Sequence, residues 1–322
     1  MSRLLSILLT ALLLLSPGVP ATGVSGASAK ESCDAAATAF NQARSGGNLD
    51  GTIASYQALT GAGCSEELLY CAGIGVALSY VDAAYGKADD TTDIDSIRQE
   101  LLAGKAYGSP WQLLVGLADL TTAKARADKN GAGFTEAAGY YQDALNTISE
   151  PPICTDASGL PSNDEIGSIH KRMTEALLLA PQFEVVRTRA GTCGGVFLAS
   201  IRGFTPTYRP LPINFEFDKA EFTAAGKQAA DQLLQCLIEE HPDRVVLSGH
   251  TDMKGPADYN MELSKRRLAS VEKLLRDGGF TGELVLMPMG ETEPFEADDP
   301  SQYTEQEIDQ LNRRVALRSS VE

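Results

Sequence analysis

The first half of the chain follows a helical pattern of hydrophobic and polar positions. Apolar residues recur at spacings of three and four, and short breaks rich in glycine and asparagine, at 45–48 and 130–131, interrupt them. The pattern predicts helices over residues 33–44, 49–59, 66–85, 93–105, 111–128 and 134–148. We therefore expect an α-helical domain over residues 30–150.

The pattern changes after residue 205, where short apolar runs alternate with amphipathic helices. It predicts strands over residues 213–217, 244–247, 283–287 and 312–321, and helices over residues 223–239 and 257–276. In the last strand Val315 and Leu317 alternate with Arg314 and Arg318, which is typical of a strand with one solvated face. Helices on one side of a mixed sheet form a two-layer α/β sandwich. The expected fold class of the whole chain is therefore α+β.

The two patterns are separated by a segment that is harder to interpret. Glu150-Pro151-Pro152 ends the helical region, and a proline-rich stretch over 205–212 leads into the C-terminal region. Between them, residues 164–179 form one more amphipathic helix. At 322 residues, two domains are the natural expectation. We expect a connector over 151–204 and a C-terminal domain over 205–322.

The first 29 residues are predicted to be a signal peptide. Arg3 supplies the positive start, residues 4–15 form a short apolar run, and residues 27–29 (ASA) fit a cleavage signal. The mature chain is then expected to start at Lys30. We expect no membrane-spanning segment after cleavage, because no later stretch is judged long and apolar enough.

Export would place the cysteines in an oxidising compartment, where an even number suits disulfides. The six are Cys33, Cys64, Cys71, Cys154, Cys193 and Cys236. An antiparallel helix pair would bring Cys33 to Cys64, so this pair is favoured. Cys154 and Cys193, both in loops rich in glycine and proline, are candidates for a second pair. Cys236 lies among leucines of a predicted helix and is expected to be a buried thiol.

Composition and motifs exclude several functions. A net charge of −16 argues against binding nucleic acid or an anionic membrane through bulk charge. The sequence contains no Gly-x-Ser-x-Gly, no His-Glu-x-x-His, no phosphate-binding loop and no Cys-x-x-C, and its histidines, at 170, 241 and 250, are scattered. We therefore expect a protein that is not an enzyme and that needs no metal or cofactor.

The stretch 245–267 carries the clearest candidate chemistry. A β-branched run ends in Gly-His-Thr-Asp, and after a Gly-Pro break a helix places Asn260, Leu263 and Arg267 on one face. Asp252 and Arg267 would then meet at one edge of the sheet. A carboxylate beside a guanidinium suits a zwitterionic ligand. From the residues alone, capping the turn after the strand is the favoured role of Asp252.

Several motifs in order resemble one family. They are Gly-His-Thr-Asp at 249–252, Tyr-Asn at 259–260, Leu-Ser-x-x-Arg at 263–267, Gly-Glu-x-x-Pro at 290–294, Asn-Arg-Arg-Val at 312–315, and the run INFEFDKAEFT at 213–223. This set resembles the OmpA-like peptidoglycan-binding domain and covers residues 205–322. The resemblance implies a pocket that holds the diaminopimelate of a peptidoglycan stem peptide.

The resemblance also implies a role for each site residue. Asp252 would pair with the ligand ammonium and Arg267 with its carboxylate, and the loop at Asp218 would add backbone donors. Asn260, Leu263 and Arg313 would line the pocket. Two residues depart from the family pattern: Leu268, where alanine often follows the arginine, and Lys254 in the binding loop.

Two segments of the helical half resemble another repeat. Residues 47–59 and 134–145 are each similar to the second helix of a tetratricopeptide repeat, although neither has a good first-helix signature. Such repeats stack into a solenoid with a peptide-binding face. A plain helical bundle with buried tyrosines and leucines explains the same pattern.

Together these features predict a non-catalytic periplasmic protein that is associated with the wall and peripheral to the outer membrane. Its C-terminal domain would bind the stem peptide non-covalently, and its helical domain would bind another envelope protein. The alternatives are an interaction adaptor whose C-terminal pocket does not bind the wall, and a wall-remodelling enzyme. Sedimentation with purified wall separates the first two, and release of wall fragments would indicate the third.

Overall fold

Capped, amphipathic helices build the N-terminal part of the computed structural model, which describes residues 26–87, 93–150, 153–154, 159–181 and 200–318. The helices are α1 (Gly26–Ser45), α2 (Leu49–Gly61), α3 (Glu66–Lys87), α4 (Ile94–Lys105), α5 (Trp111–Ala127), α6 (Gly131–Ser149) and α7 (Asn163–Leu179). Four of them, α2, α4, α6 and α7, start at a side-chain cap, since Asn48, Asp93, Asn130 and Ser162 each accept a hydrogen bond from the first turn.

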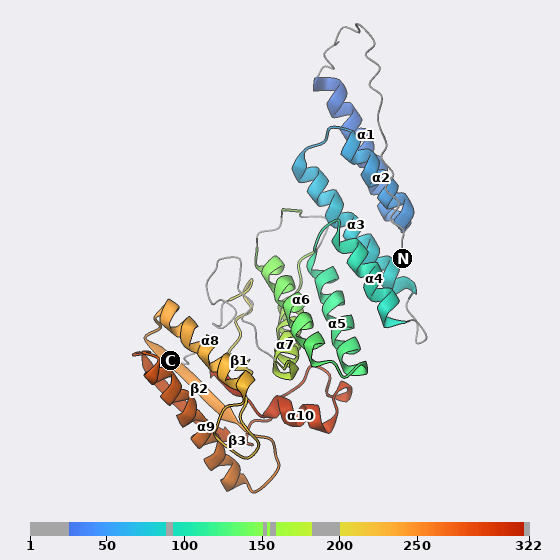
Figure 1. Cartoon of the computed structure of the whole chain (residues 1–322). Helices are drawn as coiled ribbons and strands as arrows, with labels where there is room; N and C mark the ends of the chain where they lie inside the picture. Colours follow the sequence, from blue (N-terminus) through green and yellow to red (C-terminus); the bar gives the residue numbers. More distant parts are fainter. Residues whose placement is uncertain (1–25, 88–92, 151–152, 155–158, 182–199, 319–322) are drawn as a thin grey trace, which may run out of the picture.

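The helices pack in chain order. Each of α1 to α6 contacts the next helix along the chain, and α3 also contacts α1 and α5. The result is an elongated stack that starts at α1 and α2 and reaches the C-terminal domain at α5 to α7 (Figure 1). The predicted helices are all present. Whether the stack is tetratricopeptide-like stays a prediction.

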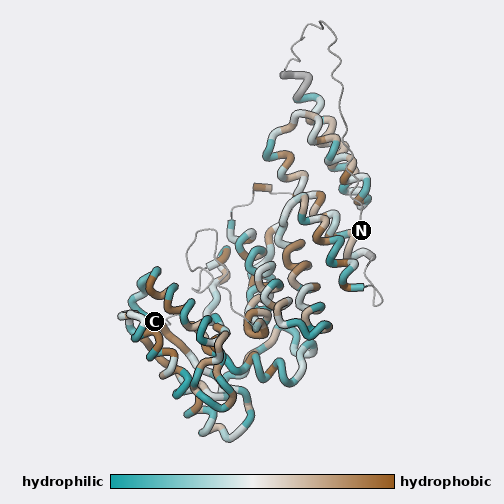
Figure 2. The backbone as a smooth tube through the Cα atoms, viewed as in Figure 1, coloured by the Kyte–Doolittle hydropathy of each residue, from teal (hydrophilic) through white to brown (hydrophobic). Residues whose placement is uncertain are grey.

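The C-terminal region is a four-stranded mixed sheet covered by helices. Its strands are β1 (Tyr208–Leu211), β2 (Arg244–His250), β3 (Glu283–Gly290) and β4 (Val315–Arg318), in the spatial order β1-β4-β2-β3. Strands β2 and β3 are parallel, and β4 is antiparallel to both β1 and β2. Helices α8 (Ala224–Glu240) and α9 (Ala257–Asp277) have alternating hydrophobic and hydrophilic positions (Figure 2) and pack their apolar sides on one face of the sheet. The α+β fold class and the α/β layers are confirmed.

Three details of this region differ from the prediction. The first strand is Tyr208–Leu211 and not 213–217, within which Phe215 makes only an isolated bridge to Phe222. Pro210 argues against a strand when the sequence is considered alone. The structure tolerates this proline because β1 is at the edge of the sheet. The last strand starts at Val315, since Asn312 ends a further helix, α10 (Glu305–Asn312). A short 3-10 helix, η1 (Pro300–Gln302), precedes α10.

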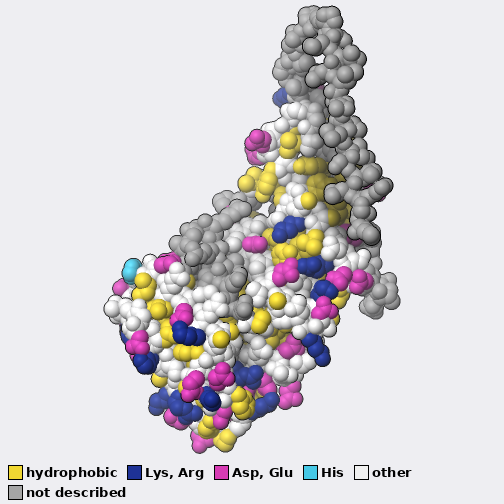
Figure 3. All heavy atoms as spheres, in the orientation of Figure 1, with side chains coloured by type: hydrophobic (Ala, Val, Ile, Leu, Met, Phe, Trp, Pro, Cys, Tyr) yellow, Lys and Arg dark blue, Asp and Glu magenta, His cyan; other side chains and the backbone are white. Residues whose placement is uncertain are grey.

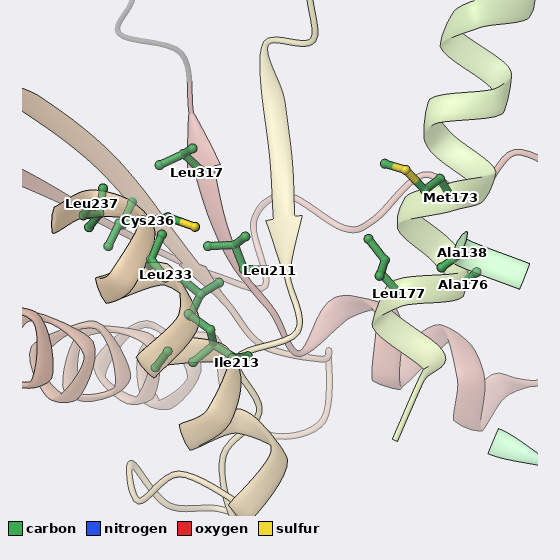
Figure 4. Packing of buried hydrophobic residues seen from close by; sticks show 14 of the residues in the cluster. Ala138, Met173, Ala176, Leu177, Leu211, Ile213, Leu233, Cys236, Leu237 and Leu317 are labelled. Atoms are coloured by element: carbon green, nitrogen blue, oxygen red, sulfur yellow. The ribbon is translucent and has the colours of Figure 1, made fainter. Parts of the chain in front are cut away.

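The two regions share one hydrophobic core. Leu211 of β1 and Leu317 of β4 lie against Leu233, Cys236 and Leu237 of α8, and Figure 4 shows β1 standing between α8 and α7. On the α7 side, Met173, Ala176 and Leu177 belong to the same cluster of buried residues. Helix α7 thus joins the C-terminal domain to α6, and the sheet is not free on its second face.

The disulfides confirm one prediction and correct two. Cys33 of α1 is bonded to Cys64, which follows α2, so this disulfide joins the two helices of the hairpin as expected. Cys154 is bonded to Cys71 of α3, so its predicted pairing with Cys193 is wrong. Cys236 is buried, but it is disulfide-bonded and not a thiol, and its partner lies outside the described residues.

The predicted signal peptide lies mostly outside the described residues, but a later helix corrects the expectation about membrane spans. Over Glu66–Gly86, α3 is long and apolar enough to cross a membrane by length and composition alone. The prediction that no later stretch meets these two criteria is therefore wrong. Within the described structure, 39% of that stretch is buried, and Val76 and Ala77 of α3 belong to the packed cores of the helical stack.

Gly249 of the Gly-His-Thr-Asp motif gives a prediction about stability. A methyl group added there would lie 2.8 Å from Cγ of Leu268, which is 1% exposed. We expect Gly249→Ala to lower the free energy of unfolding by about 1–3 kcal/mol through overpacking. Leu268→Ala alone should cost about 2–5 kcal/mol through a cavity.

The double variant tests the contact. The new methyl would fill part of the space that the leucine vacates, so the combined loss in urea unfolding should be smaller than the sum of the two single losses. Losses that add to within about 0.5 kcal/mol would contradict the contact, because independent sites add. Packing against Gly249 would then not explain why a leucine occupies position 268.

Candidate functional site

The candidate site lies where β2 ends and α9 begins. Strand β2 delivers Asp252 just after His250, and α9 presents Asn260, Leu263 and Arg267 on its inner face. All four of these predicted site side chains are buried: Asp252 is 8% exposed, Asn260 2%, Leu263 5% and Arg267 5%. The helical spacing therefore put the predicted residues on the correct side of α9.

The carboxylate of Asp252 already has a cationic partner. Its Oδ2 accepts a hydrogen bond from Nη1 of Arg313 at 2.7 Å, and its Oδ1 accepts one from the backbone N–H of Lys254 at 3.1 Å. The second bond is the turn cap that the sequence also allowed. Asp252 thus fixes its own loop and holds Arg313 at the same time.

Arg267 is a buried cation with a limited set of contacts. Its Nε donates to the backbone oxygen of Lys219 at 3.0 Å, and its guanidinium lies 5.1 Å from the centre of the Phe215 ring. Burial lowers the pKa of Arg267 to about 10, while the charge of Asp252 opposes the shift. The side chain therefore stays positive at neutral pH. Among the described residues, its terminal nitrogens have no protein hydrogen bond, so they are available to an anion.

Asn260 supports the loop that contains Asp252 and Lys254. Its Nδ2 donates to the backbone oxygens of Asp252 and Lys254, both at 3.3 Å, and to Oε2 of Glu291 at 2.5 Å. Glu291 belongs to the Gly-Glu-x-x-Pro motif, whose role sequence reasoning had not assigned. The two motifs meet through this amide, which makes Asn260 a positioning residue for the loop.

A groove of about 710 Å³ opens beside these residues. Arg267 and Arg313 line it, whereas Asp252, Asn260 and Leu263 lie behind its surface. The other residues that line it are Phe215, Phe217, Lys254, Thr304, Glu305, Gln306 and Asp309. The side chain of Phe217 is 86% exposed, which is unusual for a large apolar group in the described structure. An exposed aromatic at the edge of a cationic groove can cover a bound ligand.

Two loops close the groove. Asp218 has a positive φ of 58°, and its carboxylate accepts a hydrogen bond from the hydroxyl of Tyr259 at the start of α9. On the other side, Nζ of Lys254 forms an ion pair with Asp309 of α10. The charge of Lys254 is thus directed to α10. Sequence reasoning missed that α10 forms one side of the groove, although the capping box Thr304-x-x-Glu307 was a readable signal for this helix.

The neighbouring arginine faces the other side of the sheet. Arg314 is 4% exposed and donates to the hydroxyl of Tyr208 and to the backbone oxygens of Asn312 and Glu293. It lines a separate cavity of about 570 Å³ between α7 and the sheet. Burial, together with Arg314 and Arg318, lowers the pKa of His250 to about 3, so this histidine is neutral. Arg313 and not Arg314 is therefore the groove residue, as the motif implies.

Charges of both signs are mixed over the face of the molecule that Figure 3 shows, so a ligand would be recognised locally. No group of three or more histidine, cysteine, aspartate or glutamate side chains suited to a metal occurs in the part of the chain that the structure describes.

Comparisons with known proteins place this region in a family. Residues 214–307 match the family described as the OmpA family. Over 121 residues the chain is 33% identical to a peptidoglycan-associated lipoprotein of Pseudomonas putida, covering 37% of this chain and 66% of the relative. Over 124 residues it is 31% identical to outer membrane protein A of Bordetella avium, covering 35% and 62%. The chain thus spans slightly less than two thirds of either relative.

Among solved structures, the periplasmic domain of Helicobacter pylori MotB matches 35% of this chain and 75% of its own length, at 19% identity and a TM-score of 0.29. The family match spans β2, β3, α8, α9 and the loops at Asp218 and Lys254, but not β1 or β4. The C-terminal region of this chain, over residues 214–307, is a domain of the OmpA family.

Proposed function

We propose that this chain is a non-catalytic protein of the periplasm that binds peptidoglycan through residues 205–322. The observation that carries the proposal is the groove in which Arg267 is held buried and charged, with Asp252 and Arg313 beside it. The family match and the name of the Pseudomonas relative, a peptidoglycan-associated lipoprotein, support the same ligand.

The geometry suits one end of a diaminopimelate side chain, which carries an ammonium and a carboxylate on the same carbon. The terminal nitrogens of Arg267 would take the carboxylate through a charge-assisted, bidentate contact. Asp252 would take the ammonium and share its carboxylate with Arg313. Leu263 would pack behind the ligand, Asn260 would hold the loop, and backbone groups near Asp218 would contribute donors.

The helical stack would serve a different partner. We propose that residues 30–150 bind another envelope protein, that residues 151–204 connect the two parts, and that the protein is associated with the wall beside the outer membrane. The relatives named above are a peptidoglycan-associated lipoprotein and an outer membrane protein, and neither name denotes a catalyst. This supports a binding role.

A sedimentation experiment tests the proposal. The full chain is mixed with purified sacculi that contain diaminopimelate, and the pellet is quantified with increasing free diaminopimelate or 1,5-diaminopentane. We expect diaminopimelate to release the protein and the diamine to do so much less, because the diamine keeps both ammonium groups and has no carboxylate for Arg267 to bind.

Two outcomes would count against the proposal. Equal competition by 1,5-diaminopentane would show that Arg267 does not recognise a ligand carboxylate. A folded chain that stays in the supernatant would favour the adaptor function, in which the groove binds an acidic or zwitterionic end of a protein partner. Release of soluble wall fragments during the incubation would instead indicate a remodelling enzyme.

A further inference from the structure

Helix α10 lies between the groove and the helical stack. On one side, Thr304, Glu305, Gln306 and Asp309 form a wall of the groove. On the other side the helix packs under α5 and α7, as Figure 1 shows. The residue that follows α10 is Arg313, which is paired with Asp252. The position of this one short helix therefore affects two contacts with the binding loop, Asp309 to Lys254 and Arg313 to Asp252.

Arg126 of α5 contacts the start of this segment. Its guanidinium lies 4.3 Å from the centre of the Tyr303 ring, its Nη1 donates to Oε1 of Gln302 at 3.3 Å, and its Nε is 3.6 Å from Oε1 of Glu307. These contacts hold η1, Tyr303 in the link between η1 and α10, and the first turn of α10. They all come from one side chain, which is not among the residues that line the groove.

Glu175 of α7 provides a second, buried contact. It is 3% exposed, and it accepts hydrogen bonds from the backbone N–H of Asp298 at 2.6 Å and from the hydroxyl of Tyr303 at 2.5 Å. Burial raises its pKa, and the two hydrogen bonds oppose that shift. Among the described residues, the hydrogen bonds to this buried carboxylate all come from the C-terminal domain, which makes the contact specific.

The last turn of α10 is also attached to the stack. Nε2 of Gln310 donates to the backbone oxygen of Leu178 at 2.9 Å. Leu311 is 0% exposed and lies in a cluster with Ala125 of α5, Phe134 of α6 and Leu178 of α7. An isolated helix of eight residues is not stable in water, so tertiary packing must hold α10 in place.

We propose that the helical stack positions α10 and thereby sets the affinity of the groove, with Arg126 and Glu175 as the positioning residues. The inference rests on the proposed function, because the groove ligand is the readout. It follows that a protein bound to the stack near α5 and α7 changes wall binding, and that wall binding changes the affinity for that protein by the same factor.

Two measurements on the full chain test this. The first is the affinity for diaminopimelate-containing sacculi, and the second is amide hydrogen exchange in residues 299–312 without ligand. We expect Arg126→Ala to weaken sacculus binding about five-fold or more, the usual lower range of coupling between sites. Exchange in residues 299–312 should become faster. Arg126→Lys, which keeps the charge over the Tyr303 ring, should restore part of both effects.

Arg98→Ala is the matched control. Arg98 is similarly buried and also makes an ion pair and a hydrogen bond, to Glu136 and Thr121, but both partners belong to the helical stack. It should change neither measurement. Tyr303→Phe is the milder second variant, which removes the hydrogen bond to Glu175 and keeps the ring, should Arg126→Ala not fold.

The outcomes separate this inference from the proposed function. If wild type binds and the Arg126 and Tyr303 variants bind equally well while exchange in α10 rises, the stack does not set the affinity and the inference is wrong. If Arg98→Ala weakens binding as much as Arg126→Ala, the effect is general instability and the inference is also wrong. If folded wild type does not bind at all, the proposed function itself fails.

Discussion

Replacing Arg267 with alanine is expected to abolish recovery of the full chain with sacculi. The guanidinium is 5% exposed and has only Lys219 O as a hydrogen-bond acceptor among the described residues, so its terminal nitrogens can bind the ligand carboxylate in a site shielded from water. A hydrogen bond to a charged group contributes about 1.5–3 kcal/mol, which corresponds to roughly 10- to 150-fold in affinity. A loss of that size removes a micromolar complex from a pellet.

The adjacent residue provides the control. Arg266 is exposed on the outer side of α9, where its guanidinium lies 5.6 Å from the Tyr259 ring. Arg266→Ala removes the same charge from the same helix but leaves the groove intact, so it should bind like wild type. If both variants lose binding equally, the positive side chains of α9 hold the chain to the wall without a specific pocket, and the pocket assignment is wrong. Circular dichroism must show that each variant is folded.

The second large effect concerns stability. We expect the pair of changes Cys71→Ser and Cys154→Ser to lower the free energy of unfolding of the helical stack by about 4.5 kcal/mol. This disulfide closes a segment with a sequence separation of 83, so it restricts the unfolded chain strongly. It also fixes the segment that follows α6 onto α3.

The other described disulfide serves as the comparison. Cys33–Cys64 has a sequence separation of 31, and the same entropy argument predicts a loss of about 3.7 kcal/mol. Urea unfolding followed by circular dichroism should therefore rank the two double variants in this order. The reverse order would show that strain or local packing, and not loop closure, decides the difference. Substitution is preferable to a reductant, because Cys236 is also disulfide-bonded.

Local signals in the sequence were enough to locate helices α1 to α9, but not α10. Caps such as Asn48, Asp93 and Ser162 and the apolar spacing of each helix are properties of a few neighbouring residues. The same is true of Asn260, Leu263 and Arg267, which share a helix face through their spacing alone. The motif order then indicated the family of the C-terminal domain.

The features that sequence reasoning missed depend on distant partners. Strand β1 contains Pro210 and forms a strand because β4 offers it an edge, which no local pattern reveals. Cys154 meets Cys71 because of how the helices stack. Helix α10 is only eight residues long and is held by α5 and α7, so its periodicity is too short to read. Its capping box, Thr304-x-x-Glu307, is a local signal for the helix, but it does not show that the helix forms one side of the groove.

The common core that joins α7 to β1 and α8 gives the molecule a mechanical property. The candidate groove, which α10 lines, and the far helices α1 and α2 lie at opposite ends of the described structure, joined by helices that each pack on the next (Figure 1). A chain anchored at the groove would act as a rigid spacer and not as a flexible tether. Anything held at α1 and α2 would keep a fixed distance and direction from the wall, and a pull on it would be transmitted as load to α7, the sheet and the anchored ligand.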